Sequence, residues 1–351
     1  MITNKPKVTV LMPVFNSDKY IKKSIESILN QSFADFEFLI INDGSTDSSA
    51  KIIKSFTDAR IKYIENENNL GIVETLNKGL GLARGEYIAR MDSDDISLPE
   101  RFIKQTQFMD KFPDVAVCGS WVRNFGTVHS ISKLPIDNEQ AAIMLIFDNA
   151  IAHPASMIRR SALPETLYRT EYIYAEDYDL WARLSLSWKI SNIPEVLLKY
   201  RVHHQQISQK KSSVQNDVAL KIQINLISSL FGLMPTVEDL AAHRLLTSYG
   251  ARLQKKSLDE VEHWLMKLVK MNEDTEKFNR RNFNVIVEKY WKNFCMRDGS
   301  LGIYVFKRCV GLPLYQNNKR LDLSILSLLA RSSAYSVWHY LQKISKIKLF
   351  Q

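Results

Sequence analysis

Residues 87–95 read YIARMDSDD, an apolar run with strand character that passes directly into three carboxylates grouped around one serine. Carboxylates crowded at a strand end repel one another and raise each other's pKa unless a cation neutralises them. Hard divalent cations prefer oxygen ligands of this kind. The stretch therefore predicts a cation site at the end of a buried strand. The simpler alternative is an Asp-rich turn before a helix capped at Ser97, because Asp and Ser are common in turns.

Outward from this stretch, residues 1 to about 120 alternate between short apolar runs and segments whose apolar residues recur at helical spacing. This alternation is typical of βαβ units that build a mostly parallel sheet buried on both faces. The expected strands are 8–12 (closed by Pro13), 36–41, 61–64, 87–91 and 115–118, and the expected helices begin at Asp18 and at the cluster 45–48 or span 72–82 and 100–112. The predicted fold class is α/β, with helices flanking the sheet.

Polar loops follow three of the predicted strands. They are residues 13–16 (PVFN), 42–45 (NDGS) and 92–95 (DSDD). In open α/β sheets, ligands bind beyond the carboxyl ends of the strands. Each loop alone is explained by turn or capping chemistry, but three at successive strand ends favour a binding site at one edge of the sheet.

From about residue 205 the pattern changes to long helical stretches, with an apolar segment at 220–233. Residues 205–351 hold 23 Lys and Arg against 12 Asp and Glu, a net charge of +11, whereas residues 1–204 hold 24 against 26, a net charge of −2. A basic surface suits anionic lipid, phosphate or nucleic acid. Residues 326–348 mix Leu and aromatic residues with Lys, which fits either a helical packing domain or an amphipathic face on a membrane surface.

The composition is that of an ordinary globular protein, with 351 residues, 45% of them apolar and 24% charged. No run approaches the roughly 18 apolar residues of a membrane-spanning helix, and the N-terminus has no signal-peptide pattern. Cys118, Cys295 and Cys309 are far apart and are expected to be reduced, buried thiols. We expect a cytoplasmic protein, whose basic C-terminal part is suited to the inner face of the cell membrane.

Seven short motifs extend the pattern beyond the acidic loop. In order, they are PVFN (13–16), NDGSTD (42–47), NLG (69–71), ARGEYIA (83–89), DSDD (92–95), EDYDLW (176–181) and YRVH (200–203). This ordered set resembles family 2 glycosyltransferases of the bacterial cell-surface polysaccharide type, which have the Rossmann-like GT-A fold. The resemblance covers residues 7 to about 208. It implies a catalytic domain at 1–208, with a nucleotide-sugar half at 1–120 and an acceptor half at 121–208, followed by a basic helical region at 209–351.

The resemblance also implies a metal site. Asp94 would bind Mn²⁺ or Mg²⁺ directly, Asp92 would face the metal or the ribose, and His203 matches a third ligand of some members, with His204 as its neighbour. A cation held on a diphosphate lowers the barrier to its departure. The implied donor is a nucleotide sugar, UDP-linked because Asp43 matches a residue that binds a pyrimidine. The other implied donor-site residues are Pro13, Phe15, Asn16, Arg84 and Ser93.

The acceptor half carries a second acidic pair, Glu176 and Asp177, flanked by Tyr174, Tyr178 and Trp181. By resemblance, Asp177 is the general base that removes the proton of the acceptor hydroxyl during a single inverting displacement. Glu176 would orient the acceptor or Asp177, and the aromatic residues would stack on sugar faces. The alternative is the polar first turn of a helix, where acids are favourable. The segments 153–154 (HP) and 159–160 (RR) are expected near the acceptor or a phosphate.

The function that the resemblance implies is extension of a lipid-linked glycan in lipopolysaccharide O-antigen or capsule synthesis. A sugar-phosphate nucleotidyltransferase needs a Gly-rich loop after the first strand, and residues 8–17 contain no glycine. A nucleic-acid or anionic-lipid binding protein that uses the basic half is the other alternative. The acidic loops disfavour nucleic acid because they repel phosphates, so we expect no nucleic-acid partner. The sequence carries no prediction of oligomeric state.

Overall fold

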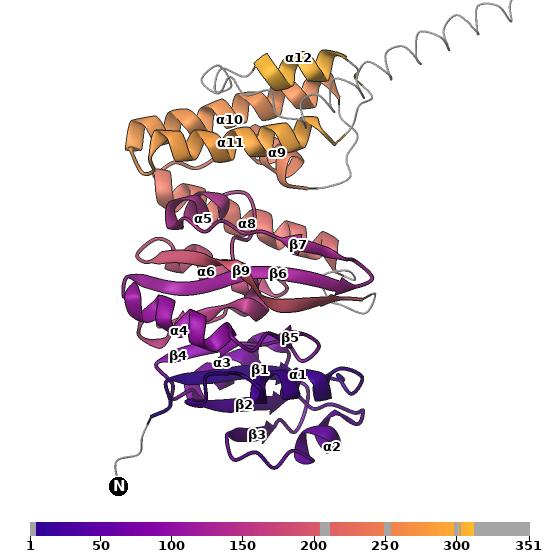
Figure 1. The fold of residues 1–351 in the computed structure, drawn as a ribbon. Coiled ribbons are helices and arrows are strands. Elements are labelled where there is room, and N and C mark those ends of the chain that lie inside the picture. The colour runs from indigo at the N-terminus through magenta and orange to yellow at the C-terminus, as the bar shows by residue number, and fades with distance from the viewer. Residues whose placement is uncertain (1–4, 204–210, 249–253, 298–300, 302, 312–351) are drawn as a thin grey trace, which may run out of the picture. The chain divides into compact units, whose positions relative to one another are not determined.

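The computed structural model describes residues 5–203, 211–248, 254–297, 301 and 303–311 of the chain (Figure 1). The chain divides into two compact units, Met1–Leu226 and Ile227–Gln351. The first unit contains the whole sheet and the first part of helix α8 (Ser212–Phe231), and the second is helical. The predicted domain boundary at residue 208 lies outside the described residues.

The first half of the sheet is parallel, as the alternating pattern predicts. Its strands lie in the order β3 (Ile61–Glu65), β2 (Phe36–Asn42), β1 (Val8–Val14) and β4 (Tyr87–Arg90). The connecting helices are α1 (Ile21–Leu29), α2 (Ser49–Lys54) and α3 (Ile72–Leu82). Every residue of β1, β2 and β4 is buried, which accounts for the continuous apolar runs of these strands.

The second half of the sheet is mixed. Beyond β4 the order continues through β8 (Met157–Arg159), β6 (Val115–Gly126), β9 (Lys189–Val202) and β5 (Ile96–Ser97), with β7 (Ser130–Ser132) paired to β6. β8 runs antiparallel to both neighbours, whereas β6 and β9 are parallel. The helical elements of this half are α4 (Arg101–Lys111), α5 (Asn138–Met144), η1 (His153–Ala155), η2 (Arg160–Ala162), η3 (Thr170–Tyr172) and α6 (Glu176–Leu184). The α/β class with flanking helices is confirmed.

The expected end of the first strand at Pro13 is wrong, because Pro13 lies within β1 opposite Ile41. The backbone direction explains why proline fits there. The N–H of Met91 donates to the carbonyl of Leu11, so the backbone N–H and C=O of Leu11 point toward β4. The backbone nitrogen of Pro13, two residues later, points the same way. β4 pairs with β1 only as far as Leu11, so the missing N–H of Pro13 falls where the ladder has already ended.

Ser97 does not cap a helix, because it lies in the short strand β5 and pairs with Leu198 of β9. α4 begins at Arg101, whose side chain is fully buried. The Arg101 guanidinium donates from Nη2 to the carbonyls of Arg90 (2.8 Å) and Ser156 (2.9 Å). Burial lowers the pKa of Arg101 to about 9. These bonds tie α4 to the end of β4, directly before the acidic loop.

The second unit contains α9 (Val237–Thr247), α10 (Lys255–Thr275), α11 (Arg280–Cys295) and α12 (Ile303–Gly311). α10 and α11 run side by side (Figure 1). Trp264 of α10 and Trp291 of α11 are fully buried, and the Trp264 indole donates to His243 Nδ1 (2.9 Å). Within the described ranges no helix is both long and apolar enough to span a membrane. The predicted amphipathic segment 326–348 lies outside the described residues.

The apolar segment 220–233 is confirmed as helical up to Phe231, where α8 ends before Gly232 with φ +69°. Leu233, which the pattern assigns to the helix, is exposed. All three cysteines are buried and none of them forms a disulfide, as expected.

Replacing Gly85 with Ala should lower the free energy of unfolding by about 1–3 kcal/mol, because the new Cβ has no space. It would lie 2.4 Å from the backbone nitrogen of Thr9 and 2.8 Å from the carbonyl oxygen of Tyr87. Thermal and urea unfolding measure the effect. Gly81→Ala in α3 is the control, since no atom lies within 4 Å of its Cβ position and Ala favours helix by up to about 1 kcal/mol. Equal stability of the two variants would contradict the packing at Gly85.

Candidate active site

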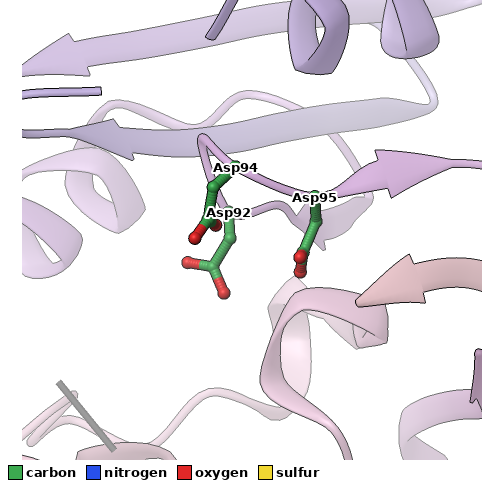
Figure 2. Close-up of side chains that lie close together, drawn as sticks. All are labelled: Asp92, Asp94 and Asp95. Carbon is green, nitrogen blue, oxygen red and sulfur yellow. The ribbon is translucent and has the colours of Figure 1, made fainter. Parts of the chain in front are cut away.

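The acidic loop between β4 and β5 brings three carboxylates together. One oxygen each of Asp92, Asp94 and Asp95 lies within 4.8 Å of the other two (Figure 2). The loop keeps this form because the Ser24 hydroxyl of α1 lies 2.9 Å from the carbonyl oxygen of Ser93 and 2.7 Å from that of Asp95. The Ser93 hydroxyl is also bonded to that of Ser17 (2.7 Å). The loop is thus held by side-chain hydroxyls of other segments, and not by turn geometry alone.

The electrostatics of the cluster favour a cation. Burial, and then the charge of Asp92, raise the pKa of Asp94. Asp95 is fully buried, and burial followed by the charges of Asp92 and Asp94 raises its pKa well above the usual value. Its Oδ1 accepts from the Arg201 N–H (2.7 Å), whereas Oδ2 has no partner within the described part of the chain. Oxygen ligands with an unpaired buried acceptor fit a hard divalent ion.

His203, at the end of β9, points at this cluster. Its Nε2 lies 2.9 Å from Oδ2 of Asp94, and its ring lies 5.3 Å from that of Tyr20. The neighbouring Arg201 donates from Nε to the Asp94 carbonyl (2.8 Å). Of the three predicted metal ligands, the structure therefore places Asp94 next to both Asp92 and His203. His204 lies outside the described residues.

The second acidic pair begins α6. Burial, followed by the charge of Asp177, raises the pKa of Glu176 to about 7. Burial also raises the pKa of Asp177, while bonds from the Tyr178 backbone and from Asn149 oppose the rise. Asn149 Nδ2 donates to Asp177 Oδ2 (2.8 Å), so the carboxylate has a fixed orientation. Glu176 Oε2 is buried and has no partner among the described residues.

Both acidic clusters line one cleft of about 860 Å³ in the first unit. Asp92 and Asp94 lie in its wall together with Glu176 and Asp177, on elements more than eighty residues apart in sequence. Two carboxylate clusters that face a shared cavity, one suited to a cation and one with raised pKa values, are typical of an active site.

Arg90 lies in the same cleft, although no sequence motif predicts a role for it. It is almost fully buried, pairs with Asp92 through Nη1, and its Nε has no partner in the described ranges. The signal in the sequence was a charged residue inside an apolar strand. Asn149 carried no such signal, because an isolated Asn in a loop is unremarkable.

The predicted donor-site residues divide into two groups. Phe15, Asn16 and Ser93 line the cleft, and Phe15 is 48% exposed. Pro13 and Asp43 are buried and are not part of the cleft wall. The Asp43 carboxylate accepts from the backbone N–H groups of Leu70 and Gly71 (2.9 Å each) and from Asn66 Nδ2 (2.8 Å), so it braces the loop before α3.

Arg84 also lies outside the cleft wall. Its Nε donates to Oε2 of Glu37 (2.7 Å). Burial acts to raise the pKa of Glu37, but hydrogen bonds from Arg84 and Thr9 outweigh burial and hold this pKa below its usual value. Arg159 and Arg160 likewise stabilise the fold: Arg159 donates to the Val115 carbonyl and Arg160 to the Gly85 carbonyl. These guanidinium groups are bound to other groups of the protein and do not reach the cavity.

The aromatic residues beside the acidic pair differ in exposure. Tyr178 and Trp181 are buried, and the Tyr178 hydroxyl donates to the Leu145 carbonyl (2.6 Å). Tyr174 alone of the three lines the cleft. His153 also lines it, bonded to the Tyr168 hydroxyl (2.9 Å), and burial lowers its pKa well below the usual value.

Comparison with known proteins places this arrangement in a class. The structure is similar to that of TarS residues 1–349 from S. aureus in complex with UDP, with a TM-score of 0.54 and 16% identity over 90% of this chain and 93% of that one. At this level of identity the likeness concerns the fold, which is GT-A. Residues 9–167 match the family model described as glycosyl transferase family 2.

Proteins of similar sequence are also glycosyltransferases. An uncharacterized glycosyltransferase of Haemophilus influenzae is 35% identical over 235 residues, which span 63% of this chain and 73% of that protein. The O-antigen biosynthesis glycosyltransferase WbnJ of Escherichia coli is 36% identical over 219 residues, 59% of this chain and 83% of its own. The chain belongs to glycosyl transferase family 2, and the protein is a glycosyltransferase of a family with members in bacterial polysaccharide synthesis.

Glu176→Gln should stabilise the fold at alkaline pH. A carboxyl whose pKa rises on folding, from 4.5 to about 7, makes the native state progressively less stable between these values as the pH increases. The uncharged amide removes this penalty, so the variant should gain up to about 3 kcal/mol above pH 7 and little below pH 4.5.

Thermal unfolding between pH 4 and pH 9 measures this difference. Glu165→Gln is the control, because Glu165 is exposed, and its curve should follow that of the wild type. A Glu176→Gln variant with the same pH dependence as the wild type would refute the raised pKa.

Proposed function

We propose that the protein is an inverting, divalent-metal-dependent glycosyltransferase that moves a sugar from a UDP-sugar to a glycan acceptor in cell-surface polysaccharide synthesis. The observation that carries the proposal is the position of the two acidic clusters in the wall of one cleft. The similarity to the O-antigen glycosyltransferase WbnJ supports a role in polysaccharide synthesis. The similarity to TarS, whose structure contains UDP, supports a UDP-linked donor.

On the donor side, Asp94, Asp92 and His203 would hold Mn²⁺ or Mg²⁺. A bound ion would neutralise the charge that grows on the departing diphosphate. Phe15 offers an exposed ring for the base, and Asn16 and Ser93 offer polar groups to the nucleoside. Pro13, Asp43 and Arg84 do not line the cleft, so we assign them to the support of these loops rather than to contact with the donor.

On the acceptor side, Asp177 acts as the general base. The acceptor oxygen attacks the anomeric carbon, the bond from that carbon to the diphosphate oxygen breaks, and the hydroxyl proton passes to the Asp177 carboxylate. Attack from the face opposite the leaving group inverts the anomeric configuration. Asn149 holds the carboxylate in position, and the raised pKa of Asp177 makes it a stronger base than an exposed Asp.

We place the reaction in the cytoplasm, with the basic C-terminal region in contact with the inner face of the membrane. The support is the net charge of +11 over residues 205–351. Anionic lipid attracts such a region.

Asp94→Asn should reduce metal-dependent hydrolysis of a UDP-sugar by about a hundredfold or more, because the ion loses a charged ligand. Mn²⁺ should raise the melting temperature of the wild type, but not that of the variant. EDTA should abolish the activity, and fresh Mn²⁺ should restore it. The exposed Asp35→Asn is the control. Full activity of Asp94→Asn in EDTA would exclude a metal from the reaction.

Asp177→Asn should lower transfer by about 10²–10⁴-fold, the usual contribution of a general base. Nucleotide release in the presence of acceptor measures transfer, with Asp35→Asn again as control. The Mn²⁺-induced rise in melting temperature should remain, since Asp177 is not a metal ligand. Wild-type rates in a folded Asp177→Asn protein would remove this residue from the mechanism.

A further inference from the structure

Tyr174 has a backbone conformation that large side chains rarely adopt. Its φ is +75°, in the left-handed region that favours glycine. Among the described residues the other non-glycine cases are Asn16, a residue type that tolerates this region, and Glu276, at the end of α10. Strain of this kind persists only where surrounding structure enforces it, and it is concentrated at functional sites.

The first part of α8 enforces it. Gln215 donates from Nε2 to the Tyr174 carbonyl oxygen (2.7 Å). The preceding turn is held by the same helix, because Asn225 Nδ2 donates to the Tyr172 hydroxyl (3.0 Å) and the Lys221 ammonium lies 4.7 Å from the centre of the Tyr172 ring. These residues of α8 follow the stretch that matches the family model, which ends at residue 167.

Tyr174 lines the cleft three residues before Asp177, and Gln215 lines the same cleft. The Tyr174 hydroxyl makes no hydrogen bond within the described part of the chain, whereas those of Tyr172 and Tyr178 are both bonded to the protein. An aromatic face with an unused hydroxyl is suited to the apolar face and the hydroxyl edge of a sugar ring.

We propose that Tyr174 is the platform for the acceptor sugar and that Gln215, a positioning residue, sets its orientation. The proposal rests on the proposed function, since it places the acceptor beside Asp177. Acceptor selectivity then depends on α8, outside the family-matched region. The ligand class is a pyranoside whose attacking hydroxyl points toward Asp177.

The experiment compares the wild type with Tyr174→Gly, Tyr174→Phe and Gln215→Ala, using a panel of p-nitrophenyl glycosides. Saturation-transfer NMR measures binding of the glycosides, and nucleotide release measures the KM values for glycoside and UDP-sugar. Tyr174→Gly should raise the glycoside KM or dissociation constant about tenfold and should change the KM for the donor less than twofold. Tyr174→Phe should retain most of the binding, because the ring remains.

Two readouts separate this role from a structural one. Tyr174→Gly should melt at the same temperature as the wild type or higher, because glycine accepts a φ of +75° without strain. Gln215→Ala should weaken glycoside binding in the wild-type background and have no further effect in Tyr174→Gly, since it acts through the ring. Ile173→Ala, an exposed neighbour outside the cleft wall, is the matched control.

Glycoside binding that is equal in wild type and Tyr174→Gly would overturn the inference, and so would a wild type that binds none of the glycosides. Loss of donor and acceptor binding together, with a lower melting temperature, would indicate a structural role and also overturn it. Failure of the proposed function has a different signature, in which the wild type neither hydrolyses nor transfers any UDP-sugar.

Discussion

The mutual repulsion of three carboxylates at one strand end is the constraint on which the catalytic unit depends. Asp92, Asp94 and Asp95 remain close only because other elements hold their loop, namely Ser24 of α1 and Arg201 of β9. Burial raises the pKa values of Asp94 and Asp95, and the repulsion, which is stronger here than in water, raises them further. A divalent cation would relieve the repulsion, which is why the cluster supports the proposed metal site.

The order of the strands converts this loop into half of an active site. β8 lies between β4 and β6, so the segment that precedes it, with Asn149 and His153, lies beside the end of β4. β9 pairs with β5 on its other side, and His203, which follows β9, lies next to Asp94. In the proposed mechanism the parallel half supplies the donor loops, the mixed half supplies the base, and the cleft lies where the two halves join.

Buried charge is used in two ways around this junction. Arg101 supports the fold by donating to backbone carbonyls, whereas Arg90 lies in the cleft with an unpaired Nε beside Asp92. Burial, and then the charge of Asp177, raise the pKa of Glu176 to about 7. A carboxyl pair of this kind, in a cleft that Gln215 of α8 also lines, is suited to hold a base beside a hydrogen-bond donor.

The sequence by itself determined the elements whose apolar residues repeat at short range. α3 has the predicted bounds 72–82, and the polar loops follow the predicted strands, because burial of one helix face or of a whole strand leaves a local pattern. Tertiary structure alone decided which charged groups reach the cleft. Arg84 is bound by Glu37 and Asp43 by backbone N–H groups, while Arg90 and Asn149 reach the acids. Such pairings depend on strand order and register between distant segments, and no local periodicity records them.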